Sequence, residues 1–191
     1  MLFNEKPRIL ALVGMPGAGK TLCAKYLEDK GFFQYRFGGI VTGEVVRRGL
    51  PLIPENERQI REEIRANEGM DAIARRALPY LREALKTRPA IVIDGLYSFS
   101  EYKLLQAEFD GDMVVVAVTC ARPLRYERLT SRTDRPLTVD EAIQRDIQEI
   151  ETLEKGGPIA MADFTFSNNT APQDLLNQLQ ILLEQFAMRP N

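Results

Sequence analysis

Residues 14–21 read GMPGAGKT, and this stretch decides the fold. It fits the pattern G-x-x-x-x-G-K-[S/T], in which a glycine-rich loop surrounds the phosphates of a nucleoside triphosphate. Such a loop directs several backbone N–H groups at one anion, and glycine permits both the backbone angles and the close approach. A helix that begins here aims its free N–H groups and the positive end of its dipole at the same anion. We therefore predict a phosphate-binding loop.

The positions within this loop have separate roles. Lys20 would place a positive charge on the β- and γ-phosphates, and the Thr21 hydroxyl would bind Mg²⁺. The flanking sequence supports the prediction, because residues 8–13 (RILALV) are typical of a buried parallel strand and residues 21–30 have helical periodicity. The loop residues expected to bind ATP are Gly14, Pro16, Gly17, Ala18, Gly19, Lys20 and Thr21.

Length and composition describe one globular domain over residues 1–191. The net charge is −2, so no overall positive field favours nucleic acid or an anionic membrane as a partner. The chain has no histidine and two cysteines, Cys23 and Cys120, which we expect in the core rather than in a disulfide or a zinc site. The N-terminus, MLFNEKPR, lacks the apolar segment of a signal peptide, and no apolar run has membrane-spanning length, so we expect a cytoplasmic protein.

Apolar strands alternate with helical segments along the chain. Strands are predicted at residues 8–13, 32–37, 90–93, 113–119 and 164–167. Helices are predicted at residues 21–30, 40–48, 55–68, 70–85, 98–108, 122–130 and 138–155 and from Pro172 onward, with GGP at residues 156–158 as a stop. This order predicts an α/β fold of three layers, α/β/α, with a five-stranded parallel sheet. Ligands of such folds bind at the carboxyl ends of the strands, where Gly14, Gly38, Asp94, Arg122 and Asn168 should converge.

Asp94 ends the apolar strand IVID, which is the Walker B arrangement. A carboxylate at this place would hold Mg²⁺, or a water bound to it, beside Thr21. The structural alternative is an aspartate that only caps the turn at Gly95.

Arginines cluster within residues 122–138, which we interpret as a lid. Phosphoryl transfer spreads negative charge over equatorial oxygens, and the forked guanidinium group matches that geometry. A helix would bring Arg122, Arg125 and Arg128 toward one face, and Arg132 and Arg135 follow in the loop. We expect Arg128, Arg132 and Arg135 to act in catalysis, with Arg128 also contacting the nucleotide. The alternative is a solvated charged helix that pairs with Glu127 and Asp134.

Residues 38–88 form a second, mostly helical segment that we expect to bind the phosphate acceptor. Arg36 and Arg47 are well placed for this, at a strand end and on the next helix. Arg58, Arg61 and Arg65 share one helix face by their spacing. They would either clamp an acceptor phosphate or pair with surface glutamates.

Several motifs resemble one known family. They are GMPGAGKT at residues 14–21, IVIDG at residues 91–95, the arginine-rich segment after Thr119, and IAMADFTFSNNT at residues 159–170. The chain resembles a P-loop nucleoside/nucleotide kinase, nearest to dephospho-CoA kinase and to uncharacterised kinase-like proteins related to it. The resemblance implies a P-loop NTPase fold and places Asn168 and Asn169 near the adenine base. TGEVVR at residues 42–47 is similar to the acceptor segment of adenylate kinases, which implies that Arg47 holds the acceptor phosphate.

One departure affects the expected chemistry. Kinases that phosphorylate a hydroxyl often carry a carboxylate after the second strand, but residues 37–39 read FGG here. Glu44 is the nearest carboxylate and would substitute as a base in the acceptor site. Without a base, either the acceptor is a phosphate, which needs no deprotonation, or the protein binds ATP without transferring its phosphate.

Two functions follow from the sequence. The first is an ATP- and Mg²⁺-dependent phosphotransferase that acts on a nucleotide or a related small metabolite with a phosphate or hydroxyl acceptor. The alternative is a nucleotide-binding regulatory module that binds or slowly hydrolyses ATP without a small acceptor. The identity of the acceptor, the choice between ATP and GTP, and the oligomeric state stay open at this point.

Overall fold

A computed structural model describes residues 6–133 and 135–190, so residues 1–5 of the N-terminal segment, Asp134 of the lid and Asn191 lie outside the description. Its five strands form one sheet in the order β2-β3-β1-β4-β5, and every neighbouring pair is parallel. The strands are β1 (Ile9–Val13), β2 (Phe33–Arg36), β3 (Ile91–Asp94), β4 (Met113–Thr119) and β5 (Phe164–Ser167). The predicted five-stranded parallel sheet is confirmed.

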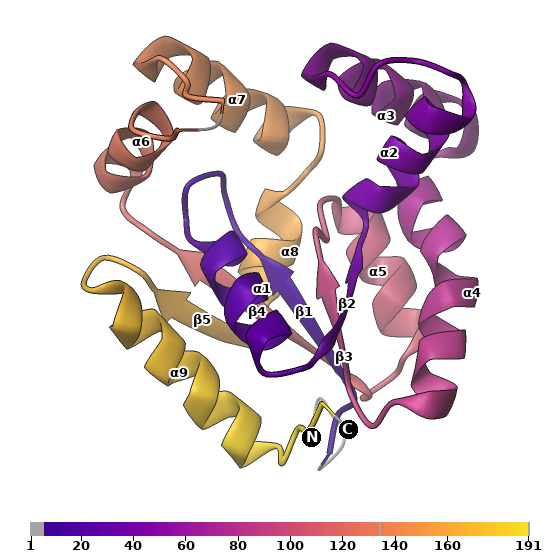
Figure 1. Ribbon diagram of the computed structural model, residues 1–191, viewed down its shortest axis with the longest axis vertical. Helices are drawn as coiled ribbons and strands as arrows, with labels where there is room; N and C mark the ends of the chain where they lie inside the picture. Colours follow the sequence, from indigo (N-terminus) through magenta and orange to yellow (C-terminus); the bar gives the residue numbers. More distant parts are fainter. Residues whose placement is uncertain (1–5, 134, 191) are drawn as a thin grey trace.

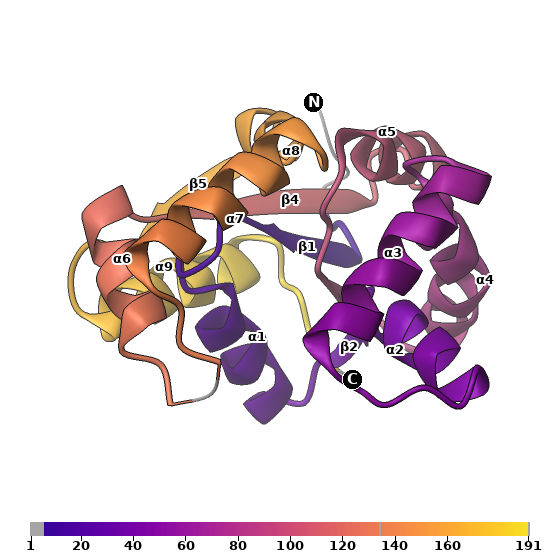
Figure 2. The same cartoon turned by 90° about the horizontal axis from the view of Figure 1, so that it is seen from above.

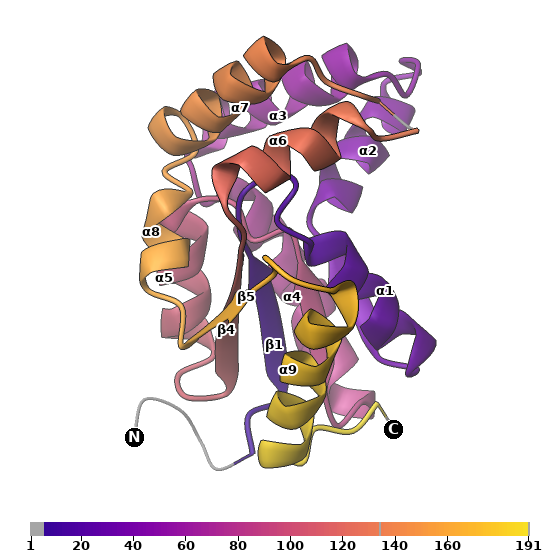
Figure 3. The same cartoon turned by 90° about the vertical axis from the view of Figure 1, so that its left-hand side faces the viewer.

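Helices cover both faces of the sheet, as Figures 1 and 3 show. One face carries α1 (Lys20–Asp29) and α9 (Pro172–Gln185), and the other carries α4 (Ala72–Thr87), α5 (Phe99–Glu108) and α8 (Gly156–Ala160). Successive side chains of a strand point to opposite faces. Leu10 and Leu12 of β1 therefore pack into the core beneath α1 and α9, while Ile9, Ala11 and Val13 pack into the core on the α4 and α5 side. The α/β/α layering is as predicted.

The remaining helices stand above the carboxyl ends of the strands, at the top of Figure 1. On one side are α2 (Gly38–Arg47) and α3 (Pro54–Glu68), and on the other are α6 (Arg122–Thr130) and α7 (Val139–Glu151). Figure 2 shows α3 and α7 on either side of β1 when the molecule is viewed from above. The two helix pairs thus flank the edge of the sheet at which ligands are expected.

Two helix boundaries differ from the sequence prediction. The helix predicted at residues 40–48 begins two residues earlier, since Gly38 and Gly39 form the first turn of α2. Residues 138–155 do not form one helix, because α7 ends at Glu151 and a short helix, α8, begins at Gly156. Pro158 is tolerated there since the first turn of a helix needs no N–H donor at that position. Gly157 lies so close to Phe99 that a Cβ atom would collide with its ring, so glycine lets α8 pack on α5.

The predicted helix starts at residues 98 and 138 agree with the structure. A capping box forms at each, with the Ser98 and Thr138 hydroxyls accepting from the backbone N–H of Glu101 and Glu141. Cys23 is buried, Cys120 is half-buried just beyond β4, and both are free thiols. Within the described residues, no helix is both long and apolar enough to span a bilayer.

Candidate active site at the strand ends

The phosphate-binding loop connects β1 to α1 and depends on glycine. Gly14 and Gly19 have φ angles of 146° and 118°, which side chains with a Cβ atom rarely adopt. A Cβ atom on Gly14 would collide with the carbonyl of Val118, and one on Gly19 would collide with the Asn168 amide. The loop is therefore held close to β4 and to the residue that follows β5.

Lys20 crosses the loop that precedes it. Its Nζ donates to the carbonyl oxygen of Gly14 at 2.6 Å and to that of Met15 at 3.2 Å. Burial, and to a lesser extent the neighbouring charge of Lys155, lowers the pKa of Lys20 to about 7. Lys20 is half-buried, and the negative charge of an incoming anion would favour its protonated form.

A cavity of about 420 Å³, the phosphate cavity, opens beside Lys20. Thr21 and Asp94 both line it, and burial raises the pKa of Asp94. Hydroxyl and carboxylate oxygens are ligands that suit Mg²⁺, which usually takes one or two from protein and the rest from phosphates and water. No group of three metal-binding side chains occurs within residues 6–133 and 135–190, in keeping with that sparse donor set.

The lid arginines on α6 have different partners. Arg125 turns inward, donates to the Pro16 carbonyl oxygen at 2.9 Å and pairs with Asp146 of α7 at 2.5 Å. Arg125 thus fixes α6 to the loop and to α7. Arg128 lines the cavity and donates to the Asn168 carbonyl oxygen at 3.0 Å. Of these two, Arg128 is the one that lines the cavity.

The two loop arginines have different locations. Arg132 lines the cavity beside Arg128. Arg135 lies 3.8 Å from Glu57 of α3, so it joins the lid to the opposite helix. Glu57 is thus an acidic partner of the lid that the sequence did not identify. The candidate partner Asp134 lies outside the described residues.

Asn168 and Asn169 follow β5, as expected, but only Asn168 lines the cavity. Its Nδ2 donates to the Ala18 carbonyl oxygen at 2.7 Å, which fixes the orientation of the amide. Among the described residues, nothing donates to its buried Oδ1. Asn169 instead accepts from the backbone N–H of Ala121 at 2.7 Å and ties β5 to the start of α6. Asn168 therefore has a buried acceptor without a partner in the described part of the chain, next to the phosphate-binding loop.

The acceptor candidates on α2 form ion pairs. Glu44 pairs with Arg47 at 2.6 Å and with Arg48 at 2.7 Å. Hydrogen bonds from these two arginines lower the pKa of Glu44 to about 2, so this carboxylate is a poor proton acceptor at neutral pH.

The arginines on α3 diverge. Arg65 is buried and pairs with Glu101 of α5 at 3.1 Å. Arg58 lies 3.4 Å from Glu55 on its own helix. Arg61 is half-buried between them. The shared face predicted from the spacing thus carries a buried structural residue, a surface residue and a half-buried one.

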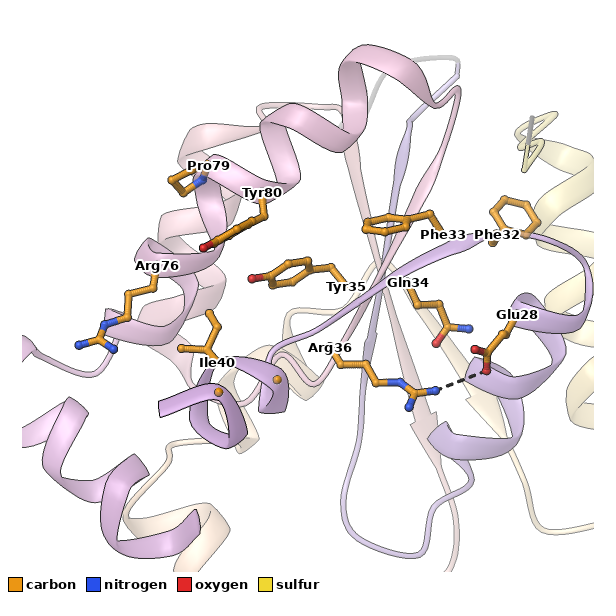
Figure 4. A pocket seen from close by; sticks show the side chains of 12 residues that line it. Glu28, Phe32, Phe33, Gln34, Tyr35, Arg36, Ile40, Arg76, Pro79 and Tyr80 are labelled. Atoms are coloured by element: carbon orange, nitrogen blue, oxygen red, sulfur yellow. Dashed lines mark hydrogen bonds and ion pairs between the residues drawn. The ribbon is translucent and has the colours of Figure 1, made fainter. Parts of the chain in front are cut away.

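A larger cavity of about 1030 Å³ lies along the open edge of β2 (Figure 4). Tyr35 and Tyr80 stack in its wall with ring centroids 5.7 Å apart. Arg36 lines the same cavity, pairs with Glu28 and lies 3.9 Å from Asp94 Oδ2. Arg36 thus stands between this outer cavity and the phosphate cavity.

The sequence did not identify four polar or charged residues that line the phosphate cavity: Tyr97, Arg145, Glu149 and Lys155. Tyr97 follows β3 by three residues, and the other three come from α7 and the segment before α8. None belongs to a local motif. Only their position just after a predicted strand or the lid could have drawn attention to them.

A glycine-to-alanine pair tests the geometry of the loop. Gly19→Ala is expected to lower the free energy of unfolding by about 2 kcal/mol, because the φ angle is strained and the methyl group collides with Asn168. Gly43→Ala is the matched control, since it is helical, has no atom within 4 Å of the added carbon and should stabilise by up to about 1 kcal/mol. Urea unfolding monitored by circular dichroism measures both. Equal effects would show that the loop tolerates a side chain.

Comparison with known proteins supports this assignment of the fold. Residues 10–159 match AAA_18, an AAA domain family. A UPF0200 protein of Thermococcus gammatolerans is 34% identical over 180 residues, which cover 93% of this chain and 94% of that protein. A UPF0200/UPF0201 protein of Archaeoglobus fulgidus is 35% identical over 180 residues, but the match spans only 55% of its length.

Two solved structures share the architecture. TT1252 from Thermus thermophilus superposes with a TM-score of 0.64 at 17% identity, covering 94% of this chain and 98% of that chain. Shikimate kinase from Bacteroides thetaiotaomicron superposes with a TM-score of 0.59 at 16% identity, covering 93% and 98%. At this identity the likeness concerns the fold alone. The comparisons establish a kinase-like P-loop fold and do not single out dephospho-CoA kinase.

Proposed function

We propose that this chain, which belongs to the UPF0200 proteins and carries an AAA domain of the AAA_18 family, is an ATP- and Mg²⁺-dependent phosphotransferase. The observation that carries the proposal is the shared cavity. Lys20, Thr21 and Asp94 line one space together with Arg128 and Arg132, although they come from three distant parts of the sequence. Phosphoryl transfer requires these group types in one place, because its catalysis is positioning and charge stabilisation.

Each residue would have a defined task. Lys20 would hold the β- and γ-phosphates, and Arg128 and Arg132 would face the charge that develops on the transferred group. Thr21 and Asp94 would hold Mg²⁺, which neutralises phosphate charge when bound. Arg135 would act from the far side of the lid, where it now pairs with Glu57.

The acceptor would enter between the lid and the segment of α2, α3 and α4. Arg36 would approach it from the β2 side, since its guanidinium group lies beside Asp94. Arg47 would reach an acceptor phosphate only after exchanging its bond to Glu44. Glu44 would thus serve as a partner of Arg47 rather than as a base. Dephospho-CoA remains one candidate acceptor among several small metabolites.

The test is ADP release from ATP and Mg²⁺ across a panel of acceptors: nucleoside monophosphates, nucleosides, shikimate, dephospho-CoA and a 5′-hydroxyl oligonucleotide. Release that rises with one acceptor and is lost in Asp94→Ala would support the phosphotransferase and identify its substrate. Tight ATP binding without acceptor-dependent release would overturn it. That result would favour the alternative, a nucleotide-binding regulatory module, which the absence of a carboxylate at residues 37–39 also favours.

Asn168 provides a prediction about the base. Its Oδ1 is buried and lacks a donor among the described residues, so after turning toward the cavity it would accept a hydrogen bond from the exocyclic amine of adenine, whereas guanine presents a carbonyl oxygen at that position. Asn168→Ala should therefore reduce the preference for ATP over GTP by about tenfold, the value of a hydrogen bond of roughly 1.4 kcal/mol. Titration calorimetry with both nucleotides measures the ratio of the two dissociation constants.

Asn177→Ala is the control for this prediction, because Asn177 is an exposed residue of α9 that bonds to Gln173. It should leave the ratio unchanged. An unchanged ratio in Asn168→Ala as well would show that Asn168 does not read the base.

A further inference from the structure

Lys155 is a buried cation that the P-loop motif does not explain. Its side chain is 2% exposed, yet it lines the phosphate cavity. Its Nζ pairs with Glu149 and lies 4.5 Å from the centroid of the Tyr97 ring. Burying a charge costs free energy unless the charge is paired, and buried charged groups are common at ligand-binding sites.

The surroundings of Lys155 hold more positive charge than its partner balances. Glu149 is shared, because Arg145 Nε lies 3.4 Å from its other carboxylate oxygen. One carboxylate thus faces two cations, and the Lys20 ammonium group is close enough for Lys155 to lower its pKa. An anion with two negative charges would satisfy this group better than Glu149 alone.

The cluster also lies on the acceptor side of the cavity. Tyr97 lines the cavity with Asp94 of β3 and Arg145 of α7, and burial raises the pKa of its hydroxyl. The α7 helix contacts the acceptor segment, because Gln148 donates to Glu62 of α3 at 3.5 Å. Tyr97 therefore lies where the lid helix and the magnesium candidate meet, next to the acceptor segment.

We propose that Lys155, Arg145 and the Tyr97 hydroxyl form an anion subsite for the acceptor, and that the acceptor is a phosphate monoester. Glu149 occupies this subsite as an internal counter-ion until the acceptor displaces it. This inference rests on the proposed phosphotransferase function and specifies its substrate class. A monoester phosphate carries about −1.5 to −2 charges at neutral pH, which matches the two cations that Glu149 now shares.

The chemistry of such an acceptor agrees with the residues present. An ionised oxygen of the acceptor phosphate attacks the γ-phosphorus of ATP and forms a new P–O bond. The bond between the γ-phosphorus and the bridging oxygen breaks, and ADP leaves with the electron pair. No proton has to be removed from the attacking oxygen, so the sequence FGG at residues 37–39 lacks nothing that this reaction needs.

The test uses full-length protein saturated with Mg²⁺ and the non-hydrolysable analogue AMP-PNP, so that the P-loop is filled. Inorganic phosphate and, separately, AMP are then titrated by calorimetry. Lys155→Met should weaken binding of both probes by about tenfold or more, the value of a lost charge-assisted hydrogen bond. Glu149→Gln should tighten binding of both by several-fold, because the probe no longer competes with a carboxylate. Lys25→Met, on the exposed face of α1, should change neither.

Opposite effects of the two variants are the signature of a displaceable counter-ion. The double variant Glu149→Gln/Lys155→Met guards against misfolding, since it removes both charges of the buried pair and takes a partner only from Arg145, whose side chain is 47% exposed. It should bind AMP-PNP like the wild type and lose phosphate binding. Wild-type affinity for phosphate and AMP in Lys155→Met, or weaker binding in Glu149→Gln, would overturn the subsite.

The two proposals fail in different ways. Transfer to a hydroxyl acceptor, with phosphate binding unaffected by Lys155→Met, would remove the subsite and leave the phosphotransferase. Phosphate binding that responds as expected, with no ADP release for any acceptor, would retain an anion site and remove the phosphotransferase. Tighter binding of AMP than of inorganic phosphate would identify a monoester rather than free phosphate as the natural occupant.

Discussion

Lys20→Met is expected to reduce kcat/KM for acceptor-dependent ADP release by about a thousandfold while raising the stability of the protein. The loss of activity follows because a preorganised charge on the transferred group contributes roughly 3–4 kcal/mol to transition-state stabilisation. The gain in stability follows because Lys20 is a half-buried cation, and its desolvation, together with the nearby charge of Lys155, lowers its pKa to about 7. Methionine keeps the apolar stem and removes the charge.

Steady-state kinetics and thermal unfolding of the same preparations measure both effects. Lys25→Met is the control, because Lys25 lies one and a half turns along the same helix on the exposed face. It should change neither quantity. A variant at Lys20 that retains transfer would contradict the proposed role of the loop, and one that unfolds more easily would contradict the view that this charge is kept for function.

Glu101→Ala is expected to lower the free energy of unfolding by about 4 kcal/mol. Glu101 is fully buried and pairs with Arg65 of α3 at 3.1 Å. It also accepts from the backbone N–H groups of Tyr97 and Ser98, which completes the capping box of α5. Removing one partner of a buried pair costs roughly 3–5 kcal/mol, because the other charge stays buried and unpaired. Loss of the cap adds about 1 kcal/mol at most.

Urea unfolding provides the measurement, with Glu83→Ala as control. Glu83 pairs with Lys86 on α4, but both side chains are 69% exposed, so the change should be within about 0.5 kcal/mol. The double variant Arg65→Met/Glu101→Gln should recover part of the loss, since neither charge is left alone. A loss in Glu101→Ala as small as that in Glu83→Ala would show that this ion pair does not hold α3 to α5.

The arginines of α3 show that spacing along a helix does not by itself assign a role to a charged residue. Spacing places Arg58, Arg61 and Arg65 on adjacent turns, and nothing in the sequence distinguishes them. Their partners differ: Arg58 pairs with Glu55 on the surface of the same helix, whereas Arg65 pairs with Glu101 in the interior. Helix periodicity predicts which residues share a face but not which part of the molecule that face meets.

The same reason applies to α7 and α8. The periodicity of residues 138–155 predicts one helix, and Gly156 and Gly157 read as its end. In the structure Gly157 packs against Phe99, which holds α8 on α5 and carries Lys155 into the phosphate cavity. A contact between residues 58 positions apart has no local signature, so the cationic cluster around Lys155 could not be predicted.

The sequence by itself determined the five parallel strands, the layers of helices and the positions of Lys20, Thr21 and Asp94. These follow from short-range rules: apolar runs for buried strands, 3.6-residue periodicity for helices, and a loop whose glycines and lysine are read within eight residues. The tertiary structure alone decided which charges are used. Arg125 fixes the phosphate-binding loop, Arg65 pairs with Glu101 in the interior, and Lys155 belongs to the site. These roles differ because the energy of a charge depends on its burial and on partners that only the packed chain supplies.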